Sequence, residues 1–126
     1  MKGLHFKFKY KVYPFSLYVS IGETDDQVIE GMKNVGMDEN FESLKLYGDG
    51  RCVFFKCGWT VMRLKEMPTC PRTRGILAHE IFHAVHFLLD HLGLKLTYES
   101  GEAFAYLTDF ITKKIYSKID AYTQQK

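Results

Sequence analysis

The stretch between Pro71 and Gly93 places the strongest constraint on how this chain folds. Proline suits the first turn of a helix and glycine commonly follows the last one, so these two residues bound a predicted helix. Apolar residues recur every three or four positions and form one stripe, which consists of Leu77, Ile81, Ala84, Leu88 and Leu92. The opposite stripe carries His79, His83 and His86, where an ordinary amphipathic helix would carry lysine or glutamate.

Shorter elements precede this helix. Residues 6–11 alternate aromatic and basic side chains, and this period of two predicts a half-buried strand with its rings on one face and its lysines on the other. Because rings and charges then point in opposite directions, the pattern does not favour a nucleic-acid surface. Further strands are predicted over residues 15–21, 44–47, 51–55 and 59–64.

Two further helices complete the pattern. One begins after Thr24, whose spacing to Gln27 is that of a capping box, and ends at Gly36. The last begins near Ser100, a suitable N-cap, and runs to about residue 119. Strands with one helix come first and two helices follow. The predicted fold class is therefore α+β, with a small N-terminal mixed sheet, in a single domain over residues 1–126.

The composition argues against several classes of function. The 126 residues carry a net charge of +2, which is too small to predict a nucleic-acid or membrane partner. No apolar run is long enough for a transmembrane helix, and the N-terminus lacks the apolar segment of a secretory signal. Cys52, Cys57 and Cys70 form no disulfide framework, so we expect a reducing, cytoplasmic environment.

The histidine stripe contains the motif His-Glu-x-x-His at His79, Glu80 and His83. Residues four apart lie one above another on a helix, so both imidazoles can bind one zinc ion. Glu80 lies about 100° round the helix from His79, where it can take a proton from water that zinc activates. The motif thus predicts Zn²⁺ as the cofactor and Glu80 as the general base.

A catalytic zinc site needs a third protein ligand, and Glu102 is the first candidate. Between His83 and Glu102 lie the end of one predicted helix, a turn and the start of the next. Two antiparallel helices joined in this way can bring Glu102 to the histidine pair. The alternative is that Glu102, together with Tyr106 and Asp109, forms the solvated face of its own helix.

Two other residues are weaker candidates for the third ligand. Glu99 is one of them. His86 is the other, but on a continuous helix it lies about 10 Å along the axis from His79, too far for a comfortable shared ion. We therefore expect His86 to be a residue at the rim of the site.

The motif and its spacing to Glu102 resemble the gluzincin branch of the zincin metallopeptidases. The chain is also similar to short His-Glu-x-x-His proteins encoded by phages, and residues 99–105 are similar to the glutamate motif of ImmA/IrrE-type peptidases. The specific resemblance covers residues 79–111, roughly a quarter of the chain. It implies a minimal zincin-like fold in which His79, His83 and Glu102 are the zinc ligands.

The same resemblance implies roles for other residues. Glu80 would be the general base, and Trp59–Leu64 would be the edge strand that takes an extended peptide by strand addition. Thermolysin-type gluzincins carry an acidic residue where this chain has Tyr106, and Asp109 could take over its orienting role. Tyr106 or Tyr98 could donate the hydrogen bond that stabilises the oxyanion.

Three functions remain open at this point. The first is a zinc-dependent peptidase that acts on a peptide or protein substrate, with a protein partner completing the cleft, because so short a chain supplies few subsites. The second is a zincin-fold module that binds zinc and acts in regulation or binding without hydrolysis. The third is an α+β protein with an accidental motif, since this pattern arises by chance in about one shuffled chain in a hundred.

Overall fold

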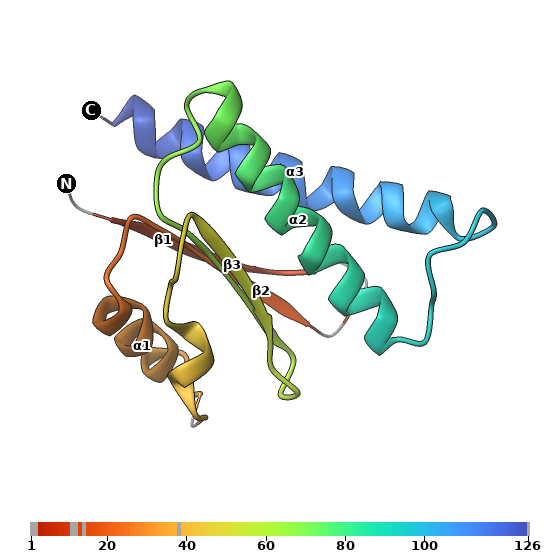
Figure 1. Cartoon of the computed structure of the whole chain (residues 1–126), viewed down its shortest axis with the longest axis horizontal. Coiled ribbons are helices and arrows are strands. Elements are labelled where there is room, and N and C mark those ends of the chain that lie inside the picture. The colour runs from red at the N-terminus through yellow and green to blue at the C-terminus, as the bar shows by residue number, and fades with distance from the viewer. Residues whose placement is uncertain (1–2, 11–12, 14, 38, 126) are drawn as a thin grey trace. The chain divides into compact units, whose positions relative to one another are not determined.

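The computed structural model describes residues 3–10, 13, 15–37 and 39–125. These residues form a four-stranded sheet and three α-helices, which confirms the predicted α+β class (Figure 1). The elements follow in the order β1 (Leu4–Lys9), β2 (Ser16–Ile21), α1 (Asp25–Asn34), the 3₁₀ helix η1 (Phe41–Leu44), β3 (Gly50–Phe54), β4 (Trp59–Leu64), α2 (Pro71–His91) and α3 (Gly101–Gln124). The chain divides into two compact units, Met1–Glu80 and Ile81–Lys126.

The sheet of the first unit is mixed, as predicted, and its strand order is β1-β2-β4-β3. β1 pairs antiparallel with β2, β2 pairs parallel with β4, and β4 pairs antiparallel with β3. The strand β4 therefore lies inside the sheet, and the prediction that Trp59–Leu64 is an edge strand is wrong. All of its residues except the first are buried, and a buried strand has to pair its backbone groups along both edges. The edges of this sheet are β1 and β3.

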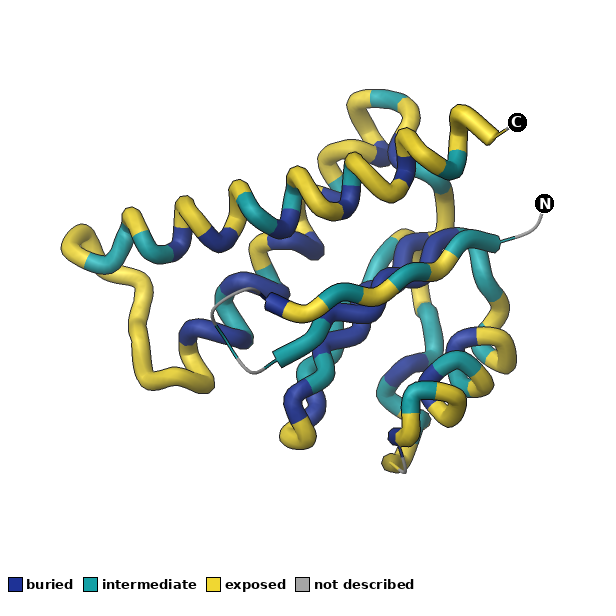
Figure 2. Tube along the Cα trace, turned by 180° about the vertical axis from the view of Figure 1, so that it is seen from behind, coloured by how far each residue is buried: buried dark blue, intermediate teal, exposed yellow. Residues whose placement is uncertain are grey.

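The strand β1 shows the predicted alternation along its length. One set of its side chains is partly buried and the other set is exposed (Figure 2). The first set is Leu4, Phe6 and Phe8, and the second is His5, Lys7 and Lys9. Lys11, the last residue of the predicted strand, lies outside the described residues. The exposed lysines need no nucleic-acid partner to explain them, because they occupy the solvent side of an edge strand.

The helix α1 begins with the predicted capping box. The Gln27 N–H donates to Thr24 Oγ1 (3.2 Å), and the Thr24 N–H donates to Gln27 Oε1 (2.8 Å). The buried side of α1 packs on the sheet face that carries Tyr18 and Val61. The core on this face consists of Tyr18, Val28, Met32, Met37, Leu44, Phe55 and Val61.

The segment after α1 differs from its prediction. Residues 44–47 were expected to form a strand, but the chain forms η1 and then continues without regular structure to β3. Side chains form hydrogen bonds with the backbone groups that would otherwise pair with a neighbouring strand. Arg63 donates to the Leu44 carbonyl (2.7 Å), and the Leu46 N–H donates to the Asp25 carboxylate (3.3 Å). Apolar alternation alone does not reveal such distant partners.

Arg63 on β4 is a buried cation, with 2% of the residue exposed. Its guanidinium donates to the Asp25 carboxylate and to the carbonyl oxygens of Leu44 (2.7 Å) and Glu23 (2.7 Å). The hydrogen bond from Arg63 also lowers the pKa of Asp25. One side chain therefore ties β4 to the start of α1 and to the end of η1.

The substitution Arg63→Met tests this role. It leaves the carbonyls of Leu44 and Glu23 without their donor, and losing one partner of a buried charged network costs about 3 kcal/mol. We therefore expect the free energy of unfolding, measured by urea denaturation, to fall by about 3 kcal/mol. Arg74→Met, at an exposed position of α2, is the matched control and should change it by less than about 0.5 kcal/mol. Equal losses in the two variants would contradict the role assigned to Arg63.

Candidate active site

The helix α2 begins and ends close to its predicted limits. The Thr73 hydroxyl accepts hydrogen bonds from the N–H groups of Thr69 (3.0 Å) and Cys70 (3.1 Å), which fixes the turn before the helix. Gly93 adopts a φ of +83° just beyond the other end, a conformation that favours glycine. Leu92 lies past the last helical residue and is exposed, so the prediction that it continues the buried stripe is wrong.

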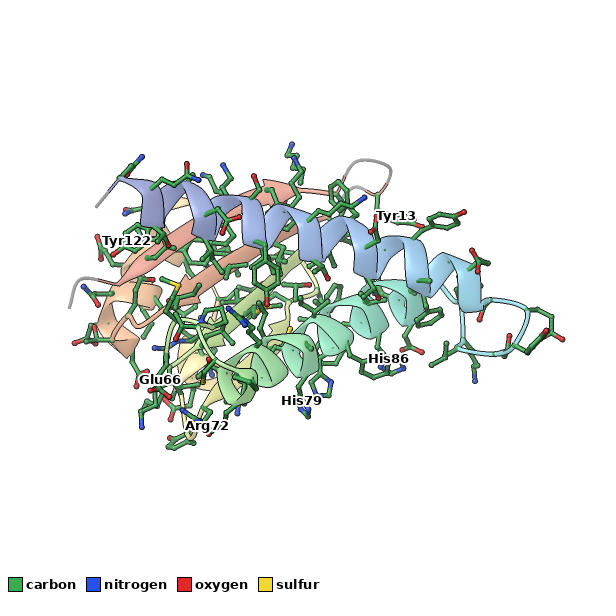
Figure 3. All side chains as sticks on the ribbon, turned by 90° about the horizontal axis from the view of Figure 1, so that it is seen from above. Tyr13, Glu66, Arg72, His79, His86 and Tyr122 are labelled. Atoms are coloured by element: carbon green, nitrogen blue, oxygen red, sulfur yellow. The ribbon has the colours of Figure 1, made fainter. Side chains whose placement is uncertain are left out.

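The two predicted stripes of α2 differ in exposure. The apolar stripe is buried at Leu77, Ile81, Ala84 and Leu88. In the histidine stripe, His79 is exposed, while His83 and His86 are half-buried. Figure 3 shows His79 and His86 projecting from the same side of the helix. The helix therefore presents imidazoles along one side, as its period predicts.

Glu80 is the buried member of the motif, with 6% of the residue exposed. Gly50, the first residue of β3, lies directly against it. A Cβ added to Gly50 would lie 2.9 Å from Oε2 of Glu80 and 3.1 Å from its Cγ. A residue without a side chain at this position leaves room for the carboxylate.

Cys52 on β3 is a titratable residue that Glu80 influences. Burial raises the pKa of the Cys52 thiol, and the negative charge of Glu80 raises it further. The thiol is therefore uncharged at neutral pH and adds no negative charge to that of Glu80. Sequence reasoning missed both Gly50 and Cys52 as neighbours of Glu80. A glycine at the start of a strand was the one available signal, because it often marks a close approach.

A cavity of about 360 Å³ opens beside this carboxylate, within the first unit. Its lining consists of Asp49, Gly50, Arg72, Gly75, Ile76, His79 and Glu80. Arg72 forms ion pairs with Glu66 and with Asp49 (Nη1 to Oδ2, 3.7 Å), and Figure 3 labels Arg72 and Glu66. One guanidinium thus pairs with two carboxylates at the rim, and the first histidine of the motif lines the same cavity as the buried glutamate.

Phenylalanine rings stack on the histidines in the second half of α2. The His83 ring stacks on Phe87, with centroids 5.8 Å apart and planes at 19°. The His86 ring stacks on Phe82, with centroids 5.8 Å apart and planes at 5°. Such stacking restricts how each imidazole turns about its side-chain bonds. The rings of His83 and His86 are therefore held in defined orientations on the helix surface.

The helix α3 confirms its predicted apolar face and continues to Gln124, beyond the predicted end. The buried stripe along α3, visible in Figure 2, includes Phe104, Leu107, Ile111 and Ile115. Ser100 occupies the N-cap position but makes no capping hydrogen bond, because its hydroxyl bonds to Thr97 and Lys95. No helix in the described part of the chain combines the length and the apolar character needed to cross a membrane.

The predicted third ligand and its neighbours lie on the exposed side of the second unit. The exposed residues are Tyr98, Glu99, Glu102 and Tyr106. Asp109 is also exposed, and its Oδ2 lies 3.0 Å from Nζ of Lys113 one turn further along α3. Within the second unit, Asp109 is therefore engaged by a lysine, which is the ordinary pairing of a solvated helix face.

The helix α2 supplies two of the three protein ligands that a catalytic zinc ion needs. His79 and His83 offer two imidazoles one helical turn apart, which is the spacing that a single ion accepts. Among residues 3–10, 13, 15–37 and 39–125, no group of three or more His, Cys, Asp or Glu side chains is placed to hold a metal ion. The two-histidine half of the site is thus present by residue type and spacing, and Glu102 remains the predicted third ligand.

Comparisons with protein family models, with curated proteins and with solved structures give no match. The function therefore has to be argued from the residues of the site.

Two glycine substitutions test the contact between β3 and Glu80. Gly50→Ala forces the Glu80 side chain to move, and overpacking of this kind costs about 1 kcal/mol in the free energy of unfolding. Gly75→Ala is the matched control on α2, where an added Cβ meets no atom within 4 Å. It should raise the free energy of unfolding by about 0.5 kcal/mol, because alanine favours a helix. Stabilisation by both substitutions in thermal denaturation would show that Gly50 is not needed by Glu80.

Proposed function

We propose that this chain is a zinc-dependent peptidase in which His79, His83 and Glu102 hold the ion and Glu80 is the general base. The observation that carries the proposal is the environment of Glu80, a buried carboxylate that lines the same cavity as His79. A titratable group that is buried at the wall of a cavity is typical of a catalytic site. An accidental motif on a solvated helix gives no reason for the glutamate to be buried against a glycine.

The proposed chemistry depends mainly on Glu80. Zinc, when bound, polarises the scissile carbonyl and makes water more acidic. Glu80 accepts the proton of the attacking water and returns it to the leaving amine. The neutral thiol of Cys52 does not compete with Glu80 as a proton acceptor. Tyr106 and Tyr98 are the candidate donors to the oxyanion, and both are exposed.

The edge strand β3 is the better candidate for binding a peptide substrate. Its first residue lines the same cavity as His79 and Glu80, whereas Trp59–Leu64 is paired on both sides. An extended peptide that adds to β3 would pass next to the carboxylate of Glu80. A protein partner stays part of the proposal, because a cavity of about 360 Å³ holds only a few substrate residues.

The metal content of the purified chain tests the ligands. Protein prepared without chelators should carry about one zinc ion per chain by plasma mass spectrometry. His83→Ala should lose the ion because one imidazole of the pair is gone, whereas His86→Ala on the same helix should keep it. Glu102→Gln should weaken zinc binding by at least about tenfold, with Glu99→Gln as its matched control. Full zinc retention in His83→Ala would rule out the proposed ligand pair.

The substitution Glu80→Gln tests the general base, since it keeps the size of the side chain and removes the proton acceptor. We expect kcat/KM on quenched fluorescent peptides to fall by at least about 100-fold while the zinc content stays unchanged. EDTA should abolish cleavage and added zinc should restore it. Cleavage that survives Glu80→Gln would exclude this residue as the base. Bound zinc without cleavage of any peptide would instead favour the zinc-binding module without hydrolytic activity.

A further inference from the structure

A second cavity, of about 630 Å³, lies between α1 and the strands β1 and β2. It opens on the sheet face that carries Tyr18. Successive residues of a strand point to opposite faces, and the registers place Gly50, with Glu80 against it, on the other face. The proposed peptidase site contributes no residue to it. Its volume is within the range of cavities that bind small molecules.

The charges that line this cavity are mainly negative. Asp26 and Glu30 lie four residues apart on α1, so both carboxylates are on the same side of the helix. Neither carboxylate forms an ion pair with another described residue. Glu23 adds a third carboxylate, and Lys7 and His5 are the basic residues of the lining. The cavity therefore favours a positively charged ligand.

Glu23 forms the deeper part of the lining, and its side chain is only 6% exposed. The Ser20 hydroxyl donates to Oε1 of Glu23 (2.6 Å), and His5 Nδ1 lies 2.9 Å from Oε2. The His5 ring also stacks on the Tyr18 ring, with centroids 5.6 Å apart and planes at 10°. The buried carboxylate is thus held by the protein itself, which leaves Asp26 and Glu30 to meet a ligand.

Tyr18 supplies the second observation. The residue is 2% exposed, and its buried hydroxyl has no hydrogen-bond partner among the described residues. A Cβ added to Gly31, which also lines the cavity, would lie 2.2 Å from this hydroxyl. Burial and the charge of Glu23 raise the pKa of Tyr18 to about 12, so the hydroxyl is a hydrogen-bond donor at neutral pH. An unpartnered buried donor costs stability, which a ligand with an acceptor would recover.

We propose that this cavity binds a small molecule or a peptide end that carries a primary ammonium group next to a hydrogen-bond acceptor. The ammonium group lies between Asp26 and Glu30, and the acceptor takes the hydrogen bond of Tyr18. An α-amino group beside an amide carbonyl has this chemistry, and it occurs both in free amino-acid amides and at the N-terminus of a peptide.

Three related probes test the ammonium group and the hydrogen-bond acceptor separately. Binding is followed by NMR titration of the isotope-labelled full chain. Alaninamide carries both groups and should bind with a Kd of about 1 mM or tighter. N-acetylalaninamide lacks the ammonium group and isopropylamine lacks the acceptor, so both should bind at least about tenfold more weakly. Equal binding of alaninamide and N-acetylalaninamide, or no shifts around Tyr18 and Glu30 with any probe, would overturn the proposal.

Variants then test the assigned contacts. Tyr18→Phe should weaken alaninamide about tenfold, leave isopropylamine unchanged and keep or raise the melting temperature, because an unpartnered hydroxyl is removed. Glu30→Gln should weaken both amines, while Asp120→Asn on α3 is the matched charge control and should change neither. A lower melting temperature in Tyr18→Phe with unchanged alaninamide binding would show that the hydroxyl is structural and would overturn its role.

A peptide probe distinguishes the two sources of the ligand. The tripeptide Ala-Ala-Ala-amide has the same ammonium group and first carbonyl as alaninamide, followed by two more residues. Tighter binding of the tripeptide assigns the cavity to peptide N-termini, and tighter binding of alaninamide assigns it to free small molecules. Either result supports the proposed chemistry, provided that the acetylated probe binds more weakly.

Discussion

The buried carboxylate of Glu80 is the group around which the candidate site is built. A carboxylate leaves water only at high cost, so its neighbours have to give it room and must not add like charge. Gly50 provides the room by having no side chain, and the Cys52 thiol stays uncharged because burial and Glu80 raise its pKa. The start of β3 and the first half of α2 therefore constrain each other. Gly50 and Glu80 line one cavity together with His79.

Most elements of the fold could be predicted because their signals are local. The alternation in β1, the capping box of α1 and the proline and glycine at the limits of α2 each act within a few residues. Two of the failures are tertiary in origin. Residues 44–47 are apolar enough for a strand, but Arg63 and Asp25 bind their backbone groups. Whether Trp59–Leu64 lies at an edge depends on β2 and β3, and a strand's own sequence does not state its partners.

In the candidate site, too, local features could be predicted and tertiary contacts could not. His79, Glu80 and His83 follow from spacing on one helix, because the helical period fixes their directions. Gly50 and Cys52 are neighbours of Glu80 in the structure but are distant from it in the sequence, so the motif alone does not predict them. The role of Glu102 depends on how the two helices approach each other, which no local pattern encodes, and it stays a prediction.

Zinc K-edge X-ray absorption on the zinc-loaded chain measures the proposed ligands most directly. The site predicts two imidazole nitrogens and one carboxylate around the zinc ion, with bond lengths of about 2.0–2.1 Å. A shell with sulfur at about 2.3 Å, or one without imidazole, would contradict a zinc centre on the histidine stripe of α2.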